Sequence, residues 1–531
     1  MRTTSLGGSK LSVAARGGEL PQWYRTTPRA AHEWQAYAGE VARSVSPTWL
    51  NDLREAIAPN GAAGRRLEHS AAGNGMVVTT GQQPGLFGGP LMSLVKAISA
   101  RALADVLQET TGMPVAPLFW AATDDADFDE ASVVTVALHT GARELRLEAQ
   151  ARAGTPMACV PIGSDVGALA DALREACGSA PHGAFVEGAL AAYHPGATVG
   201  DAYVSVLRQV LEPLEISVLD ASHPSVSRTA DSILRRALGS ADHLANALRD
   251  RRAAIERSGY AAQVADVPGL SLVFLNAGSV KTRLSLADAK SVGELSPHQF
   301  LSATVLLRPV IERGMVPTAA YVAGPGEFAY FAQVGAVAEV LGVPTPLVVP
   351  RWSAAVVEPR IQRVLDDLGT SMEAVADLSA LERRLATERV PAKASRALEA
   401  LRRDIANDID AMQSATDGLM SAPVFDGLRR SLEHRAARVE RRLVAAVKRR
   451  ETEMMRKASM AHGALYPHGS PQERRLAYVP FLARYGESLV GEMMRAARAH
   501  AVSIVAGESS AAHPAHPAHP AHPARPTRNP P

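Results

Sequence analysis

The chain has 531 residues, more than a single domain usually contains, and 47% of them are hydrophobic against 21% charged. This balance excludes a mainly disordered protein. Fifty-six Lys and Arg residues oppose 54 Asp and Glu residues, for a formal net charge of +2. Because positive and negative charges nearly cancel, an overall electrostatic attraction to nucleic acid or to an anionic membrane is not expected.

The two cysteines, Cys159 and Cys177, are too few for a disulfide framework or a zinc site of four thiolates. No run of about 18 apolar residues indicates a membrane-spanning helix. Residues 1–20 lack the apolar centre of a secretion signal. We therefore expect a soluble cytoplasmic protein with neither a membrane nor a nucleic-acid partner.

Between residues 75 and 350, short apolar runs alternate with stretches of helical periodicity. Apolar strands that alternate with helices favour a parallel sheet with helices on both faces. The sequence therefore predicts an α/β fold. The predicted strands are 76–80, 115–120, 216–220, 319–322 and 346–349, and the first leads through a glycine-rich turn into a helix at 90–107.

The pattern changes after Pro359, because apolar residues recur at heptad spacing between residues 398 and 419. A second helix is predicted to start near Pro423, with apolar residues three and four apart up to residue 447. Two long helices joined by a short turn predict an antiparallel coiled-coil hairpin. We expect a helix at 478–501 to pack back on the core and the Ala-His-Pro repeats after it to be extended.

The turn after the first predicted strand is the most informative motif. It reads Thr-Gly-Gln-Gln-Pro-Gly-Leu-Phe-Gly-Gly-Pro over residues 80–90. Glycines allow close approach of the backbone to a ligand, and a following helix N-terminus suits a phosphate or carboxylate. The spacing is neither a P-loop nor a dinucleotide fingerprint, and a plain tight turn is the alternative. The candidates for substrate binding are Gln82, Gln83, Gly85, Phe87, Gly88, Gly89 and Lys96.

Five carboxylates follow the second predicted strand, between Trp120 and Glu130. Open α/β sheets bind ligands at the carboxyl ends of their strands, where such groups can hold an ammonium group, coordinate Mg²⁺ or act as a general base. The alternative is that some of them only cap a helix. We predict that Trp120, Thr123 and Asp124 bind substrate and that Asp125 and Asp127 transfer protons.

A third glycine turn, between Tyr321 and Gln333, again joins a strand to a helix. Glu327 lies in the first turn of that helix, where it either caps the helix or faces the same cleft as the other motifs. Arg308 and Arg351 lie near strand ends and can neutralise phosphates, although a surface salt bridge fits each equally well. The candidates here are Gly324, Gly326, Tyr330 and Gln333 for substrate binding and Glu327 for catalysis.

These motifs, in this order, resemble the bacillithiol biosynthesis cysteine-adding enzyme family. The resemblance rests on the three turns and on shorter matches, and it covers nearly the whole chain apart from the first residues and the His-Pro tail. The shorter matches are Leu307-Arg308-Pro309, Pro317-Thr318, Pro350-Arg351, Tyr466-Pro467, Gln472-Glu473-Arg474 and Tyr485-Gly486.

The resemblance implies a ligase that joins L-cysteine to glucosaminyl malate in the last step of bacillithiol synthesis. It implies a Rossmann-like core related to nucleotidyltransferases, with connecting-peptide insertions, and a coiled-coil domain that mediates homodimerisation. It also implies a separate adenine-nucleotide site, with Arg351, Tyr466, Glu473 and Arg474 as candidates. The expected parts are a core at 1–357 with insertions at about 140–205 and 225–300, a helical domain at 358–464, a C-terminal segment at 465–508 and a disordered tail at 509–531.

One position departs from the family, because Ala126 stands where the family commonly has His. If that His is the catalytic base, the proton must be taken here by Asp125, Asp127 or Glu327. Forming an amide from a free carboxylate requires activation, so we expect ATP or another acyl activator, with Mg²⁺ as a candidate. The related mycothiol ligase holds cysteine through zinc, but the two cysteines here give no support for zinc, and we assign no metal ligands.

Two other functions compete with the ligase hypothesis. The core can bind a nucleotide or a sugar acid without turnover, with the coiled coil as a docking arm. The basic helix between Arg429 and Arg450 can bind nucleic acid, but Glu433 and Glu440 dilute its charge. A solvated coiled-coil face is therefore the favoured interpretation of that helix.

Overall fold

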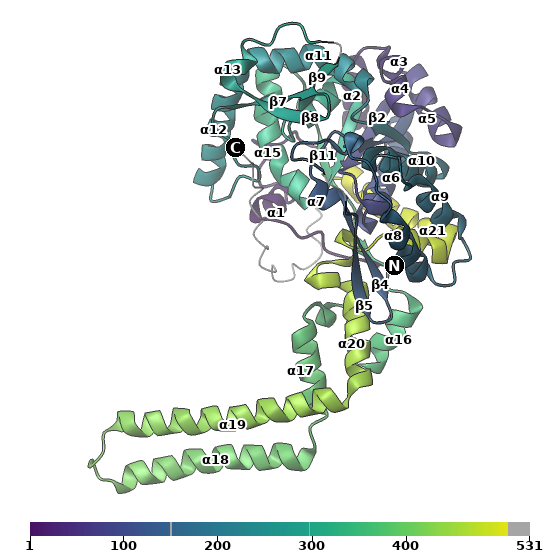
Figure 1. Ribbon diagram of the computed structural model, residues 1–531. Helices are drawn as coiled ribbons and strands as arrows, with labels where there is room; N and C mark the ends of the chain where they lie inside the picture. Colours follow the sequence, from purple (N-terminus) through teal and green to yellow (C-terminus); the bar gives the residue numbers. More distant parts are fainter. Residues whose placement is uncertain (149–150, 297, 508–531) are drawn as a thin grey trace. The chain divides into compact units, whose positions relative to one another are not determined.

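The computed structural model describes residues 1–148, 151–296 and 298–507 (Figure 1). The His-Pro repeats, which are predicted to be extended, lie outside the described residues. The described chain forms two compact units. The first contains residues 1–136, 144–355 and 473–507, and the second contains residues 137–143 and 356–472.

A five-stranded parallel sheet forms the centre of the first unit, in the order β11-β10-β2-β3-β6. All five strands predicted from the sequence are present, each within two residues of the expected bounds. The predicted α/β fold with a parallel sheet is therefore confirmed. The strands are β2 (Met76–Gln82), β3 (Val115–Ala121), β6 (Ser217–Asp220), β10 (Thr318–Ala323) and β11 (Val348–Pro350).

The strand order reverses at β2, which lies between β3 and β10. From β2 the chain first builds one side of the sheet through β3 and β6, and it then returns to add β10 and β11 on the other side. Doubly wound sheets bind their ligands at the carboxyl ends of the strands beside such a reversal. The three motifs singled out in the sequence follow β2, β3 and β10, so the fold brings them to this edge.

Long apolar helices cover the sheet. Helix α6 (Leu91–Thr111) packs on β2 and β3, and α15 (Pro325–Leu341) packs on β10 and β11. Both are buried around most of their circumference, which is typical of helices between a sheet and a further layer. The C-terminal helix α21 (Val479–Val505) packs along α6, as expected for the helix predicted at 478–501.

Smaller elements complete the first unit. The N-terminal part contains β1 (Arg2–Thr3), α1 (Lys10–Arg16), α2 (Ala31–Arg43), α3 (Trp49–Asp52), α4 (Arg54–Ile57) and α5 (Gly61–Ala72), and β1 pairs with β12 (Ala354–Ala355). Between β3 and β6 lie α7 (Phe128–Ala131), a hairpin of β4 (Val133–Leu138) and β5 (Gly141–Arg146), α8 (Val166–Cys177), α9 (Ala184–Ala192) and α10 (Val199–Leu211). Between β6 and β10 lie α11 (Pro224–Gly239), α12 (Ala241–Arg257), α13 (Leu286–Ala289), α14 (Arg308–Met315) and an antiparallel sheet of β7 (Leu270–Ala277), β8 (Val280–Ser285) and β9 (Gln299–Ala303).

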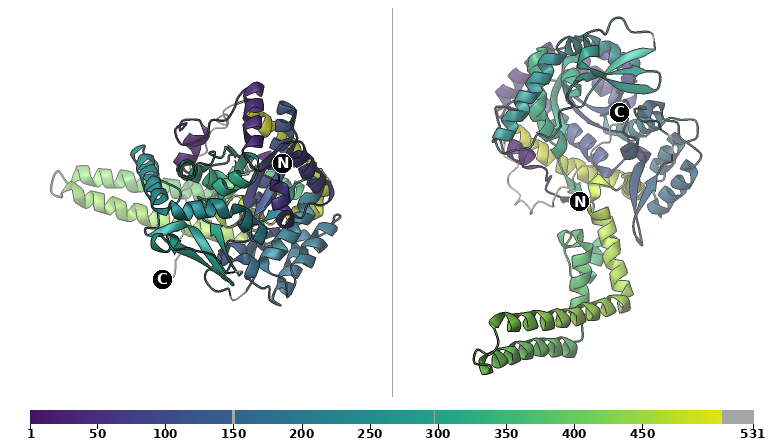
Figure 2. Two further views of the ribbon diagram at one scale, coloured as in Figure 1. Left: turned by 90° about the horizontal axis from the view of Figure 1, so that it is seen from above. Right: turned by 60° about the vertical axis from the view of Figure 1, so that its left-hand side comes forward.

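The second unit is helical, and its longest helices form an antiparallel hairpin (Figures 1 and 2). Ion pairs join Arg402 to Glu440, at 2.7 Å, and Asp410 to Arg429, so later residues of one helix face earlier residues of the other. The predicted coiled-coil hairpin is therefore confirmed. The helices are α16 (Pro359–Asp367), α17 (Leu378–Glu388), α18 (Ala392–Ala415), α19 (Ala422–Arg450) and α20 (Thr452–Leu465), and α18 and α19 make the hairpin.

Part of the predicted apolar seam stays exposed on the hairpin. Leu401 and Met412 of α18 are each 47% exposed, and Val439 of α19 is 56% exposed.

Among the described residues, no helix combines the length and the hydrophobicity that a membrane crossing needs.

Candidate active site

The glycine turn after β2 is packed from behind by tyrosines. Phe87 has a φ of 53° and is fully buried, with its ring centre 4.9 Å from that of Tyr193. The Tyr193 hydroxyl donates to the Gly85 carbonyl at 2.9 Å. A Cβ on Gly88, whose φ is +86°, would lie 2.1 Å from the Tyr478 hydroxyl oxygen. The turn therefore needs glycine to fold tightly, and Phe87 serves the core.

The start of α6 is also partly occupied by protein. The Leu91 N–H donates to the Leu476 carbonyl at 2.7 Å, and Gly88 and Gly89 are buried. We predicted that this helix N-terminus holds an anion. The structure reduces the number of N–H groups that it offers.

Lys96 joins the first motif to the third. Its Nζ donates to the Gly81 carbonyl at 2.6 Å and to Gln82 Oε1 at 3.1 Å, and it pairs with Glu327 Oε2 at 2.6 Å. Glu327 also accepts from the Tyr321 hydroxyl at 2.6 Å and from the Gly324 N–H at 2.7 Å. Glu327 is thus both a helix-capping acid, as the alternative interpretation holds, and part of the shared site.

The pKa values of this pair reflect burial and mutual attraction. Burial raises the pKa of Glu327, but Lys96, Tyr321 and the Gly324 N–H outweigh that effect and hold the pKa below its usual value. Burial lowers the pKa of Lys96, and the attraction of Glu327 offsets only part of that change. A carboxylate so strongly held by donors is a poor base near neutral pH.

Gln83 joins the first motif to the second. Its Nε2 donates to Asp125 Oδ2 at 2.5 Å, and both side chains are half-buried. Asp125 Oδ1 accepts from the Asp127 N–H at 3.0 Å, and Asp127 caps α7 by accepting from the Glu130 N–H at 3.1 Å. Gln83, Asp125 and Glu327 therefore belong to one connected set of loops at the carboxyl edge of β2, β3 and β10.

Two further candidates of the acidic motif are bound to protein groups. Lys281 of β8 pairs with Asp124 at 2.9 Å and also donates to the Asp124 carbonyl at 2.6 Å. Thr123 is buried, donates to Asp220 at the end of β6 and accepts from the Ser222 N–H at 3.1 Å. These contacts give both residues a role in holding the loop.

Glu130 is a carboxylate with a displaced pKa that we did not select from the sequence. Burial of the carboxyl group, followed by the charges of Asp127 and Asp125, raises its pKa to about 7, whereas Lys96 and Arg475 oppose the shift. The side chain keeps an exposed surface. A carboxyl group with such a pKa can exchange a proton at neutral pH. Its position three residues after Asp127 was the only signal in the sequence.

Arg308 organises the aromatic side of the same region. It pairs with the buried Glu312 at 2.8 Å, and its guanidinium lies 4.9 Å from the ring centre of Tyr321 and 5.8 Å from that of Trp120. The Tyr330 hydroxyl is 3.5 Å from the guanidinium. The structure thus brings Trp120 and Tyr330 together around Arg308, which is half-buried and pairs with the buried carboxylate of Glu312.

The predicted nucleotide residues have different surroundings. Arg351 and Glu473 form a buried two-point ion pair, in which Arg351 NH1 lies 2.9 Å from Glu473 Oε2. Arg474 is exposed, and Tyr466 is half-buried in the second unit. Gln333, predicted to bind substrate, instead exchanges two hydrogen bonds with the backbone of Val264, at 3.0 and 2.9 Å.

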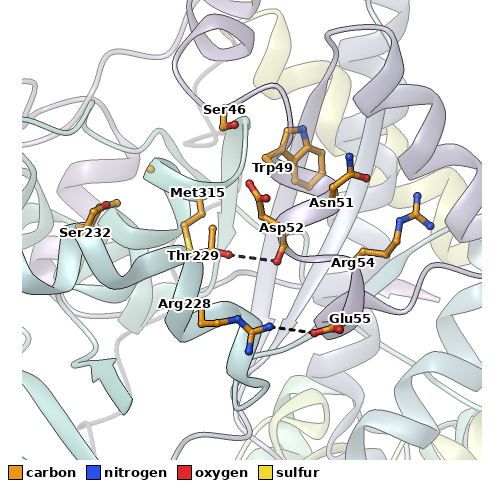
Figure 3. A pocket seen from close by; sticks show the side chains of 12 residues that line it. Ser46, Trp49, Asn51, Asp52, Arg54, Glu55, Arg228, Thr229, Ser232 and Met315 are labelled. Carbon is orange, nitrogen blue, oxygen red and sulfur yellow. Dashed lines mark hydrogen bonds and ion pairs between the residues drawn. The ribbon is translucent and has the colours of Figure 1, made fainter. Parts of the chain in front are cut away.

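A separate hollow of about 770 Å³ lies between the α3–α4 region and helices α11 and α14 (Figure 3). Its walls include an ion pair between Arg228 and Glu55, at 3.2 Å. None of the residues predicted from the sequence lines it, so the candidate site is defined by the three turns. Among the described residues, no three His, Cys, Asp or Glu side chains gather in an arrangement that could hold a metal ion.

Comparison with known proteins agrees with the two-part architecture. The chain matches the family described as "Bacillithiol biosynthesis BshC, N-terminal Rossmann-like domain" over residues 19–291 and 280–352. It matches "Bacillithiol biosynthesis BshC, C-terminal coiled-coil domain" over residues 354–503. The chain belongs to the BshC family.

Relatives in the BshC family align over most of their length. A protein of Koribacter versatilis is 30% identical over 85% of this chain and 87% of its own. Proteins of Solibacter usitatus and Salinibacter ruber are each 29% identical, over 88% and 90% of this chain and 90% of their own lengths. All three carry the name "Putative cysteine ligase BshC".

Proposed function

We propose that this protein is a ligase that joins L-cysteine to glucosaminyl malate through an amide bond, which completes bacillithiol. Membership of the BshC family and the names of its relatives support a cysteine ligase in this pathway. The observation that carries the proposal is the linkage of the three turns through Gln83–Asp125 and Lys96–Glu327. It gathers amide, carboxylate and ammonium groups at the ligand-binding edge of the sheet.

The reaction joins a carboxylate to an amine and releases the elements of water. Because a free carboxylate does not react with an amine unaided, a second substrate must activate it, and we propose ATP for this step, with Mg²⁺ as its counter-ion. The phosphate released from ATP then carries away the carboxylate oxygen. The fold itself has no P-loop to identify the nucleotide site.

We propose roles for the residues whose polar groups can still contact a substrate. The half-buried amide of Gln82 and the hydroxyl of Tyr330 orient the polar substrate, while Gln83 and Lys96 keep Asp125 and Glu327 in place. Asp127 and Glu130 face the amine, and Glu130 accepts its proton because its pKa of about 7 suits that transfer. Of the four nucleotide candidates, Arg351 and Glu473 bind each other but leave the Arg351 Nε without a partner in the described chain, and Arg474 has an exposed side chain.

We also propose that two copies of the chain associate through the hairpin of α18 and α19. The exposed apolar side chains on this hairpin, including Leu401, Met412 and Val439, support association, since such residues are usually covered in coiled coils.

The experiment is incubation of the purified chain with L-cysteine, glucosaminyl malate and ATP, followed by mass spectrometry. We expect a product with the mass of bacillithiol, formed only when all three are present. Asp125→Asn is expected to abolish it, whereas Asp129→Asn, on an exposed neighbour, serves as the matched control. If no product forms with ATP or with other nucleoside triphosphates, non-catalytic binding of a sugar acid becomes the better account.

A further inference from the structure

The N-terminus of α15 exposes donors that the proposed roles leave unused. The helix has 17 residues and begins at Pro325, after the N-cap Gly324. Helix geometry leaves the N–H groups of Gly326 and Glu327 without intrahelical acceptors and gives this end a partial positive charge. No atom lies within 4 Å of the place that a Cβ on Gly326 would occupy. This helix end is therefore open to a ligand.

Arg351 directs a buried, unpaired donor toward the same helix end. Its two terminal nitrogens bind Glu473, and one of them also binds the Trp352 carbonyl. Its Nε has no hydrogen-bond partner among the described residues, although the side chain is 0% exposed. A Cβ on Gly324 would lie 3.6 Å from this Nε and 3.4 Å from Glu327 Oε2. Glycine at 324 thus leaves a notch beside a donor that still needs an acceptor.

Arg16 contributes a second guanidinium group of the same kind. Its helix, α1, packs against α15, and a Cβ on Gly8 would lie only 2.8 Å from Pro325 Cβ. Arg16 NH2 donates to the Gly7 carbonyl at 2.6 Å, but NH1 is buried without a partner in the described chain. Burial and then the charge of Arg351 lower the pKa of Arg16. The two guanidinium groups are therefore close enough to repel each other.

Positive charge exceeds negative charge around this helix end. Arg474 directly follows Glu473, whose carboxylate binds Arg351, and its charge interacts with those of Arg351, Glu473 and Glu327. The cationic side chains here include Arg16, Lys96, Arg351 and Arg474, and the carboxylates paired with them are Glu327 and Glu473. This excess of cationic groups suits an anionic ligand.

We infer that the N-terminus of α15, together with Arg16, Arg351 and Arg474, binds an oxyanion group of a substrate, either a phosphate or a carboxylate. Backbone N–H groups and guanidinium donors are the usual ligands of both groups. The inference deepens the proposed function and rests on it for the identity of the ligand, since ATP brings phosphates and glucosaminyl malate brings carboxylates. It also assigns a role to α1, which none of the sequence motifs includes.

The test measures binding of inorganic phosphate, pyrophosphate and L-malate, each alone, to the full-length protein by isothermal titration calorimetry at low ionic strength. Arg16→Gln and Arg474→Gln remove donors, and Gly324→Ala fills the notch at a φ of −78°, which alanine adopts without strain. Arg65→Gln, on an exposed arginine of α5, is the matched control. Thermal unfolding of each variant verifies that it is folded, and the exposed position of Arg474 protects that variant from misfolding.

We expect the wild type and Arg65→Gln to bind at least one probe, and the other variants to bind it roughly tenfold more weakly or worse, the effect of one lost charge-assisted hydrogen bond. Preference for pyrophosphate assigns the site to the nucleotide, and preference for malate assigns it to the malyl group. The inference is overturned if no probe binds the wild type at millimolar concentration, or if the folded variants all bind like the wild type. Product formation is measured in parallel to separate the two proposals. If the wild type forms product but the variants bind anions as the wild type does, this inference is refuted and the proposed function is not.

Discussion

Lys96 of α6 and Glu327 of α15 form an ion pair, 2.6 Å long, that connects the turn after β2 to the helix after β10. Because β2 and β10 are neighbours at the reversal of the strand order, this pair spans the place where the sheet binds ligands. Lys96 also holds the Gly81 carbonyl, so one ammonium group orders both turns.

Replacing Lys96 by methionine should destabilise the protein by about 3–5 kcal/mol, because Glu327 is left as a buried charge without its partner. Urea unfolding followed by circular dichroism measures the change. The double variant Lys96→Met with Glu327→Gln removes both charges and should recover part of the loss. An unchanged midpoint for the single variant would show that the pair contributes nothing to stability.

The same pair predicts a loss of stability in acid. The pKa of Glu327 in the folded chain lies below its ordinary value of 4.5, so its contribution is complete above pH 4.5 and disappears as the pH falls through the folded pKa. Between pH 5 and about pH 3, the wild type should lose more unfolding free energy than the double variant. Parallel pH dependences for the two proteins would contradict this assignment.

The raised pKa of Glu130 predicts that its contribution to stability depends on pH in the opposite direction. Its pKa rises from 4.5 to about 7 on folding, so the folded chain holds a proton that the unfolded chain releases. Stability contributed by this proton is present below pH 4.5 and is lost as the pH rises toward 7. Relative to Glu130→Gln, the wild type should be less stable at pH 8 than at pH 5, as judged from urea midpoints. The rate of the proposed ligation should also rise with pH around 7, and the Gln variant should lack that rise.

Gly88 is expected to tolerate no side chain. Alanine at this position takes a left-handed φ, at a cost of about 1–2 kcal/mol, and its Cβ collides with the Tyr478 hydroxyl as well. Gly88→Ala should therefore lower the melting temperature, and Tyr478→Phe in the same chain should restore part of it by removing the nearest atom. A melting temperature equal to that of the wild type would mean that the turn has room that the structure does not show.

The hairpin provides a test of self-association. Leu401→Glu with Met412→Glu places charges on its exposed apolar face, where each of the two side chains is 47% exposed. We expect light scattering to give a dimeric mass for the wild type and a monomeric mass for the variant at an unchanged melting temperature. Replacement of the exposed Arg403 by Glu is the control, and a monomeric wild type would refute the proposed dimer.

The sequence was sufficient to predict the strands and the hairpin because their signals are local. Apolar runs such as Val77-Val78 and Leu118-Phe119, each followed by glycines or acids, favour buried strands, and these residues are buried in the structure. Heptad spacing likewise reports directly on the two helices of the hairpin. The exact ends of strands differ by one or two residues, since hydrogen bonding to the neighbouring strand decides where a strand stops.

The partners of individual side chains were not predictable, because they come from distant segments. Gln333 follows a glycine turn, as a substrate-binding residue can, but the backbone of Val264 binds both the oxygen and the nitrogen of its side-chain amide. For Arg351 the sequence left a phosphate contact and a salt bridge equally open, and the structure shows a salt bridge with Glu473, 122 residues later. The shifted pKa of Glu130 depends on burial that no short motif reveals.

The two sides of the site are joined late in the chain, with consequences for biosynthesis. Strand β10 pairs with β2 in parallel, although all elements from β3 to α14 separate the two strands in the sequence. A nascent chain that ends before β10 presents β2 as an unpaired sheet edge, and such edges recruit other strands and aggregate. Ribosome-bound intermediates and truncated products should therefore require chaperones, and splitting the gene before residue 318 should yield two insoluble halves.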